Sequence, residues 1–161
     1  VMVSLYTILK KPKPKLDLRD LKFQRSSNDE NSIIPEILTL DIIPRNFHIQ
    51  ELLFIGVSKG SVEVFDSNEI IDLFKDIKTD LYHYIPEGES RSLTGLALGL
   101  GNNSAAVSPL LIFKDERNKS WVYFQGTLKK IDKNTHKKIV EFHYLNISKF
   151  KYKLVEEIGQ K

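Results

Sequence analysis

Aromatic and basic side chains gather in one stretch of the chain, residues 120–145. Trp121 and Tyr123 stand two residues apart, so a β-strand would place both rings on the same face. Aromatic rings stack on bases and lysine ammonium groups bind phosphates, and surfaces that hold single strands combine the two. The candidate nucleic-acid-binding residues are these rings and the lysines that follow them: Trp121, Tyr123, Lys129, Lys130, Lys133, Lys137 and Lys138.

The residue types that most enzymes and metal sites need are missing or scattered. The chain has no cysteine, which excludes disulfides, thiolate nucleophiles and thiolate metal ligands. The glycine-rich segment 86–109 contains no GxGxxG and no Gly-Lys-Ser/Thr loop, and the chain has no GxSxG nucleophile elbow. We therefore expect no catalytic residue, no metal and no cofactor. The four histidines also lack the spacing of a local metal motif: His48, His83, His136 and His143.

Two segments resemble parts of the NurA-type nucleases, which have an RNase H-like fold, in their order and hydrophobicity. They are LLFIGVSKGS, residues 52–61, and WVYFQGTL, residues 121–128. In that family each apolar strand ends in a metal-binding aspartate, and here Ser58 and Gln125 occupy the two positions. Two-metal chemistry requires those carboxylates. The resemblance therefore implies an inactive relative, and we do not assign the chain to the family.

Strands would position the rings and lysines. Along the first run the even positions Val122, Phe124 and Leu128 are apolar, as the buried face of a strand requires. Residues 139–145 predict the second strand of a hairpin, after a polar loop of about four to six residues. Together with a strand at 110–113, the hairpin forms a predicted C-terminal β-meander.

One segment changes its hydrophobic period from two to about 3.6, the period of an α-helix. Apolar residues recur at three- and four-residue spacing between a capping Asp66 or Ser67 and Pro86, which predicts an amphipathic helix over 67–85. Before it, residues 47–57 and 61–65 predict a hairpin. The expected fold class is α+β: a mixed, mainly antiparallel sheet with this helix packed on one face and the C-terminal meander.

The remaining segments predict less regular structure. Residues 1–24 predict a basic N-terminal strand, a Lys/Pro arm and a short strand, and residues 25–32 predict a flexible loop. Residues 33–43 predict a short strand or an irregular edge because Pro35 interrupts them and Pro44 closes them. The glycine-rich segment can be a helix, a strand or a mobile loop. A chain of 161 residues fits a single domain, 1–161.

Composition and charge narrow the function classes. No run of about 18 apolar residues is present and the first basic cluster follows the apolar N-terminal run, so we expect a cytoplasmic protein without a membrane span. The lack of cysteine and the abundance of Ile, Lys and Glu are typical of thermophiles. The net charge is +4 over residues 1–24, −7 over 25–110 and +6 over 111–161. Two basic ends around an acidic middle suit a polyanion, an acidic partner or simply solvent.

Three function classes remain from the sequence. We rank first a non-catalytic interaction or assembly subunit that acts through protein–protein contacts or as a homo-oligomer, because opposite charges and exposed aromatic rings serve such contacts. A nucleic-acid-binding module that uses the hairpin 120–145 follows closely. A small enzyme comes last because the motifs are absent.

Overall fold

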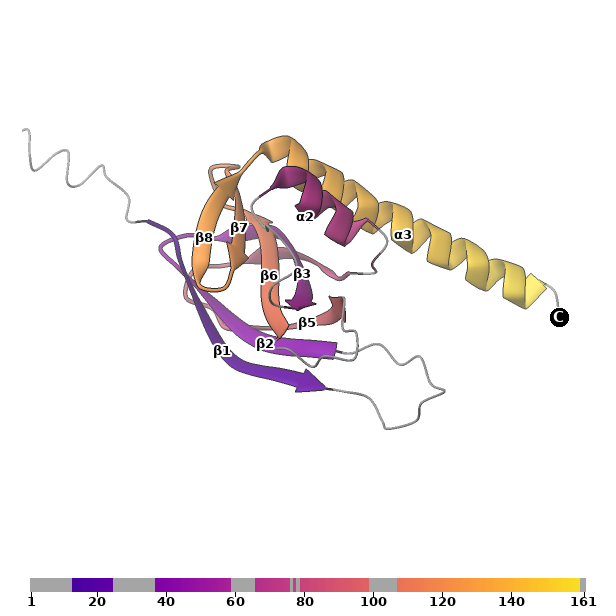
Figure 1. Cartoon of the computed structure of the whole chain (residues 1–161), viewed down its shortest axis with the longest axis horizontal. Helices are drawn as coiled ribbons and strands as arrows, with labels where there is room; N and C mark the ends of the chain where they lie inside the picture. The colour runs from indigo at the N-terminus through magenta and orange to yellow at the C-terminus, as the bar shows by residue number, and fades with distance from the viewer. Residues whose placement is uncertain are drawn as a thin grey trace, which may run out of the picture.

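Over the residues that the structure describes, the fold is α+β and dominated by one curled sheet of eight strands, with two helices (Figure 1). The computed structural model describes residues 13–24, 37–58, 66–75, 77, 79–98 and 107–159, and the side chains of these residues except 24, 58, 98 and 147–159. The elements are β1 (Lys15–Gln24), β2 (Ile37–Arg45), β3 (Ile49–Ser58), α2 (Ser67–Phe74), β4 (Leu81–Ile85), β5 (Arg91–Leu98), β6 (Val107–Lys114), β7 (Ser120–Phe124), β8 (Thr127–Ile131) and α3 (Lys133–Gly159).

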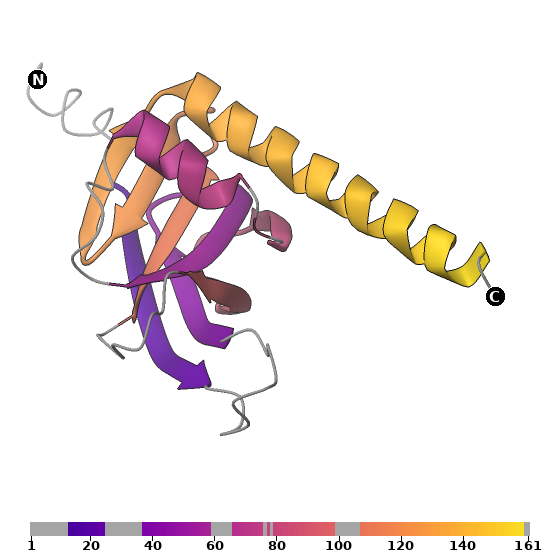
Figure 2. The ribbon, with the colours of Figure 1, turned by 45° about the vertical axis from the view of Figure 1, so that its right-hand side comes forward.

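The sheet is mixed, as predicted. Its strand order is β1-β2-β5-β3-β6-β7-β8, and β4 pairs with β3 beside this path. β3 and β5 run parallel, whereas the other described pairs are antiparallel. Figure 2 shows the sheet curling so that its strands surround an interior, with both helices on the outside.

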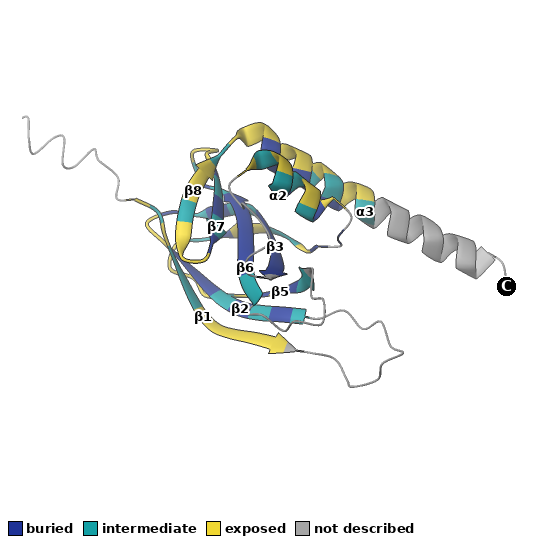
Figure 3. Ribbon diagram, viewed as in Figure 1, coloured by how far each residue is buried: buried dark blue, intermediate teal, exposed yellow. Residues whose placement is uncertain are grey.

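The strands of the sheet bury two apolar clusters, one on each face. The inner cluster contains only strand and turn residues, among them Leu38, Phe54, Leu93 and Phe113. The outer cluster combines Ile55, Ile112 and Val122 of the sheet with Ile70 and Phe74 of α2 and Ile139 of α3. β3 and β6 therefore lie between two apolar layers, which explains why LLFIGV and LLIF are continuous apolar runs. Figure 3 shows the buried strands at the centre and exposed residues along β8 and the end of β1.

The predicted helix 67–85 is too long. Asp66 caps α2 as predicted, with its Oδ1 accepting from the Asn68 amide at 2.9 Å, but the helix ends at Phe74 and residues 81–85 form β4. The sequence LYHYI is rich in aromatic and β-branched residues, and it pairs with β3 from Ile49 to Leu53. Ile77 is still buried, although it lies between α2 and β4. The pairing of residues 81–85 with β3 therefore outweighs the helical spacing of their apolar side chains.

The predicted second strand at 139–145 is wrong, and so is the hairpin loop before it. These residues belong to α3, which starts immediately after β8. Asp132 acts as the N-terminal cap: its Oδ1 accepts from the Asn134 amide at 3.1 Å, and its carbonyl accepts from the Thr135 amide. The meander therefore consists of β6, β7 and β8. Figures 1 and 2 show α3 lying beside α2 and continuing past the sheet.

The structure also tests the predictions for the N-terminal strands and for the glycine-rich segment. Residues 15–24 form the short strand β1, and β2 is an inner strand rather than an edge, because it pairs with both β1 and β5. Pro44 lies beyond the part of β2 that pairs with β5, so its missing amide donor costs that pair nothing. Of the glycine-rich segment, residues 91–98 form β5. The predictions for residues 1–12, 25–32 and 61–65 lie outside the described residues.

Candidate functional site

A pocket of about 540 Å³ lies at one end of the curled sheet, and we call it the Trp121 pocket. Trp121 of β7, Phe47 after β2, Leu128 of β8 and Pro14 before β1 provide its apolar lining. Segments distant in the sequence meet there because β1 begins opposite the end of β2 (Lys15 pairs with Arg45). The full lining is Lys13, Pro14, Asn46, Phe47, Asp115, Glu116, Arg117, Lys119, Trp121, Leu128, Lys129 and Lys130.

Asp115 fixes the indole ring of Trp121. The Asp115 Oδ2 accepts from Trp121 Nε1 at 3.0 Å, and its Oδ1 accepts from the backbone amides of Arg117 and Lys119 at 2.8 and 3.0 Å. The carboxylate is buried and bonded at both oxygens. It therefore ties the β6–β7 turn to the ring and holds the ring in one orientation, while its own charge is directed into the protein.

The rim of the Trp121 pocket is basic. Five cationic side chains line it, against two carboxylates. Repulsion from Lys130 is the main cause that lowers the pKa of the exposed Lys119. The Nζ of Lys130 lies 5.5 Å from the centroid of the Trp121 ring, within cation–π range. Cations that repel one another beside an aromatic ring form a place where an anionic group is favoured. The five cations are Lys13, Arg117, Lys119, Lys129 and Lys130.

A second pocket, of about 420 Å³, lies at the start of α3, and we call it the α3 pocket. Lys133 and Lys137 of α3 line it together with Lys114 at the end of β6. No ion pair between described residues engages Lys133 or Lys137, whereas the Lys114 Nζ lies 2.9 Å from Glu51 Oε2. The rest of the lining is Glu51, Asn118, Asn134, Val140, Glu141 and Tyr144.

A buried histidine docks α3 on the sheet. The Nε2 of His136 donates to the Glu51 carbonyl at 2.9 Å, and its Nδ1 lies 3.9 Å from Glu51 Oε2. Glu51 has a φ of 48° within an irregular stretch of the β3–β6 register. Burial is the main cause that lowers the pKa of His136, opposed by the Glu51 carbonyl and carboxylate and assisted by Lys114. The Nδ2 of Asn146 provides a second anchor, donating to the Ile77 carbonyl at 3.0 Å.

The structure divides the predicted binding residues between several places. Trp121, Lys129 and Lys130 line the Trp121 pocket, while Lys133 and Lys137 line the α3 pocket. Tyr123 is half-buried against the inner cluster, and Lys138 lines neither pocket. The alternation along β7 is as predicted, but the face that carries Trp121 and Tyr123 turns toward the interior of the curl and is only half-exposed.

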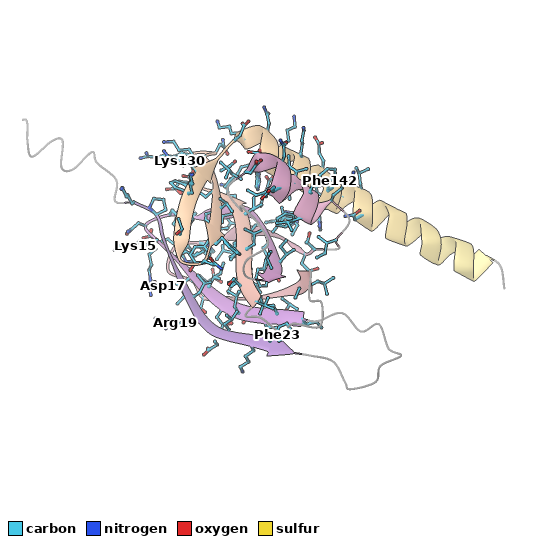
Figure 4. The ribbon with its side chains drawn as sticks, viewed as in Figure 1. Lys15, Asp17, Arg19, Phe23, Lys130 and Phe142 are labelled. Atoms are coloured by element: carbon cyan, nitrogen blue, oxygen red, sulfur yellow. The ribbon has the colours of Figure 1, made fainter. Side chains whose placement is uncertain are left out.

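Sequence reasoning missed five charged residues of the Trp121 pocket: Lys13, Asp115, Glu116, Arg117 and Lys119. Four of them lie in the β6–β7 turn, residues 115–119, which is not among the predicted binding residues. One signal was available, since an aspartate before a turn commonly accepts amides two residues on. Lys13 could not have been found in this way, because its position depends on pairing between β1 and β2. Figure 4 shows Lys130 on β8 and Lys15 at the start of β1 on the same side of the molecule.

Metal sites and membrane spans are the other site classes that the described residues address. No group of three or more His, Asp or Glu side chains that could hold a metal ion occurs among them. No described helix is long and apolar enough to cross a membrane. A comparison of the chain with models of protein families, with curated protein sequences and with solved structures finds no match.

Proposed function

We propose that the chain binds single-stranded nucleic acid at the Trp121 pocket. The observation that carries this proposal is the fixed, half-buried indole ring in a pocket that five cationic side chains line, one of them over the ring. Stacking on an aromatic side chain contributes about 1–3 kcal/mol per base and tolerates any sequence. Phosphate contacts from Lys and Arg supply the larger, salt-dependent part of the affinity. The pocket combines both groups in one place.

The size and composition of the pocket suit a base with its phosphate. A cavity of about 540 Å³ falls in the range of roughly 300–1,000 Å³ that small-ligand sites occupy. Its lining combines apolar residues with charged residues that come from the segment before β1, from the β6–β7 turn and from β8. A duplex is a poorer fit, because its bases are already stacked and their faces are covered.

Lys130 has a specific role in this proposal. Its ammonium group lies over the indole ring in the free protein, where a base would stack. A base that stacks on Trp121 takes the place of this ammonium, which then turns to the adjacent phosphate. Lys119 and Lys130 repel each other, so a phosphate between them relieves that repulsion.

The test is a set of salt titrations with a labelled single-stranded oligonucleotide, followed by fluorescence anisotropy. Lys119→Ala and Lys130→Ala should each weaken binding and reduce the slope of log affinity against log salt by about one. Trp121→Leu should weaken binding by about 1–3 kcal/mol with little change in slope, because stacking releases no counterions. Leucine keeps an apolar side chain at a position that also contacts the inner cluster.

Lys22→Ala is the matched control, since Lys22 is exposed on β1 and lines neither pocket. It should leave both affinity and slope close to those of the wild type. The proposal is wrong if Lys119→Ala and Lys22→Ala give the same affinity, or if the wild type fails to bind at low salt.

A second candidate function is contact with another protein, including a second copy of this chain. Exposed apolar side chains support it: Tyr144 and Leu145 of α3 are 52% and 55% exposed, and Leu21 and Phe23 of β1 are 49% and 39% exposed. Figure 4 labels Phe23 near the end of β1. We rank this function second because these residues line no single concave site. A solution mass that rises with concentration in the wild type and not in Leu145→Lys would favour it.

A further inference from the structure

We infer that the α3 pocket is a second phosphate subsite of the same strand, so that the ligand is an oligonucleotide that crosses the β6–β7 turn and not a single nucleotide. This inference rests on the proposed function and extends it. The Trp121 pocket would hold the stacked base, and Lys133 and Lys137 would hold a phosphate farther along the strand.

The two pockets lie on opposite sides of one short turn. Arg117 and Lys119 line the Trp121 pocket, whereas Asn118, between them in sequence, lines the α3 pocket. Asn118 has a φ of 62°, and its amide donates to the Asp115 carbonyl at 3.1 Å, which gives the turn its tight form. Neighbouring Cα atoms are about 3.8 Å apart. The linings of the two pockets therefore approach each other within the length of a short single strand.

Positive charge is concentrated in the linings of the two pockets. The two linings together contain eight Lys or Arg side chains and four carboxylates, an excess of four positive charges, whereas the whole chain has a net charge of +3. Three of the four carboxylates have partners within the protein: Asp115 bonds the turn and Trp121, Glu51 pairs with Lys114, and Glu116 accepts from the His48 amide. A chain of phosphates matches this excess better than one phosphate does.

The α3 pocket also has donors that suit a phosphate oxygen. The amide side chains of Asn118 and Asn134 lie in its lining beside Lys133 and Lys137. Glu141 brings a negative charge to the same lining, which disfavours an anion beside it. Tyr144 is exposed in the same lining and offers a ring to a neighbouring base.

The experiment compares the double variant Lys133→Ala/Lys137→Ala with the wild type on two probes, a thymidine mononucleotide bearing one phosphate and an unstructured thymidine oligomer of about eight nucleotides, within the site sizes usual for single-strand binders. The variant should weaken oligomer binding and reduce its salt slope by about two. Its affinity for the mononucleotide should not change. Lys138→Ala is the control, because Lys138 is exposed on the same helix and lines neither pocket.

The outcomes separate the two proposals. If Lys119→Ala weakens oligomer binding but the double variant binds like Lys138→Ala, the second subsite is wrong and the Trp121 pocket stands. If the wild type binds the mononucleotide as tightly as the oligomer, the second subsite is also wrong. If the wild type binds neither probe at low salt, the proposed function itself has failed.

Discussion

At the scale of single residues, His136 links the charge state of one side chain to the docking of α3. Its ring has no exposed surface, and its Nε2 donates to the Glu51 carbonyl. Burial lowers its pKa below the ordinary value of about 6.5, against the attraction of the Glu51 carboxylate. The folded protein therefore prefers the neutral ring more strongly than the unfolded chain does.

This preference predicts a loss of stability in mild acid. The unfolded chain binds the proton first, so the free energy of unfolding should be constant above about pH 6.5 and fall as the pH drops below it. Urea denaturation between pH 5 and 8 measures the effect. His136→Gln should lack this part of the pH dependence, while His83→Gln, at an exposed position, should retain it. Parallel curves for the wild type and His136→Gln would show that His136 does not titrate differently on folding.

Single residues were predicted well where the signal was local. Asp66 as a cap and the alternation of Val122 and Phe124 follow from a few neighbouring residues, and both were correct. The predicted exposure of Trp121 was too high. Alternation shows which residues share a face of the strand, but it does not show whether that face is covered by other elements. Both faces of β7 meet apolar layers in this sheet.

At the scale of elements, Gly95 allows β5 to cross close to β3. A Cβ at this position would lie 2.7 Å from the Phe54 Cδ1 and 2.8 Å from the Phe54 carbonyl oxygen. The backbone oxygen cannot move without disturbing β3, whose Gly56 and Val57 pair in parallel with β5. The glycine-rich segment is thus a closely packed strand over residues 91–98, one of the forms that its sequence left open.

Gly95→Ala should therefore destabilise the fold by about 1–3 kcal/mol, the usual cost of overpacking. The measurement is the free energy of unfolding from chemical denaturation. Thr94→Ala, at the exposed neighbouring position of the same strand, should change it by less than about 0.5 kcal/mol. Equal effects of the two substitutions would contradict the close crossing of β3 and β5.

The elements that sequence reasoning assigned wrongly share one cause. LYHYI continues the helical spacing of α2, and residues 139–145 continue the β-rich composition of β7, yet each adopts the other structure. In both cases the partner is distant: β4 pairs with β3, and α3 is anchored on the Glu51 and Ile77 carbonyls. The local pattern does not contain these partners. Asp132, the cap just before α3, was a local signal for this helix, but the segment was predicted as the polar loop of a hairpin.

At the scale of the whole molecule, the curl of the sheet brings basic residues from both ends of the chain together. Lys13 from the basic N-terminal region lines one pocket with Arg117, Lys119, Lys129 and Lys130 from the basic C-terminal region. The sequence showed both basic regions but could not show that they meet. That meeting depends on distant strand pairing: β1 pairs with β2 at one end of the strand order, and β8 pairs with β7 at the other end.

The central claim, that the Trp121 pocket binds single-stranded nucleic acid, has a direct reporter in the protein itself. Trp121 is the one tryptophan of the chain, so its fluorescence reports on this pocket alone. We predict that an unlabelled thymidine oligomer quenches it to saturation at low salt, because a base stacks on the ring, and that added salt restores it. An unchanged emission, at oligomer concentrations that saturate binding measured by anisotropy, would contradict the claim.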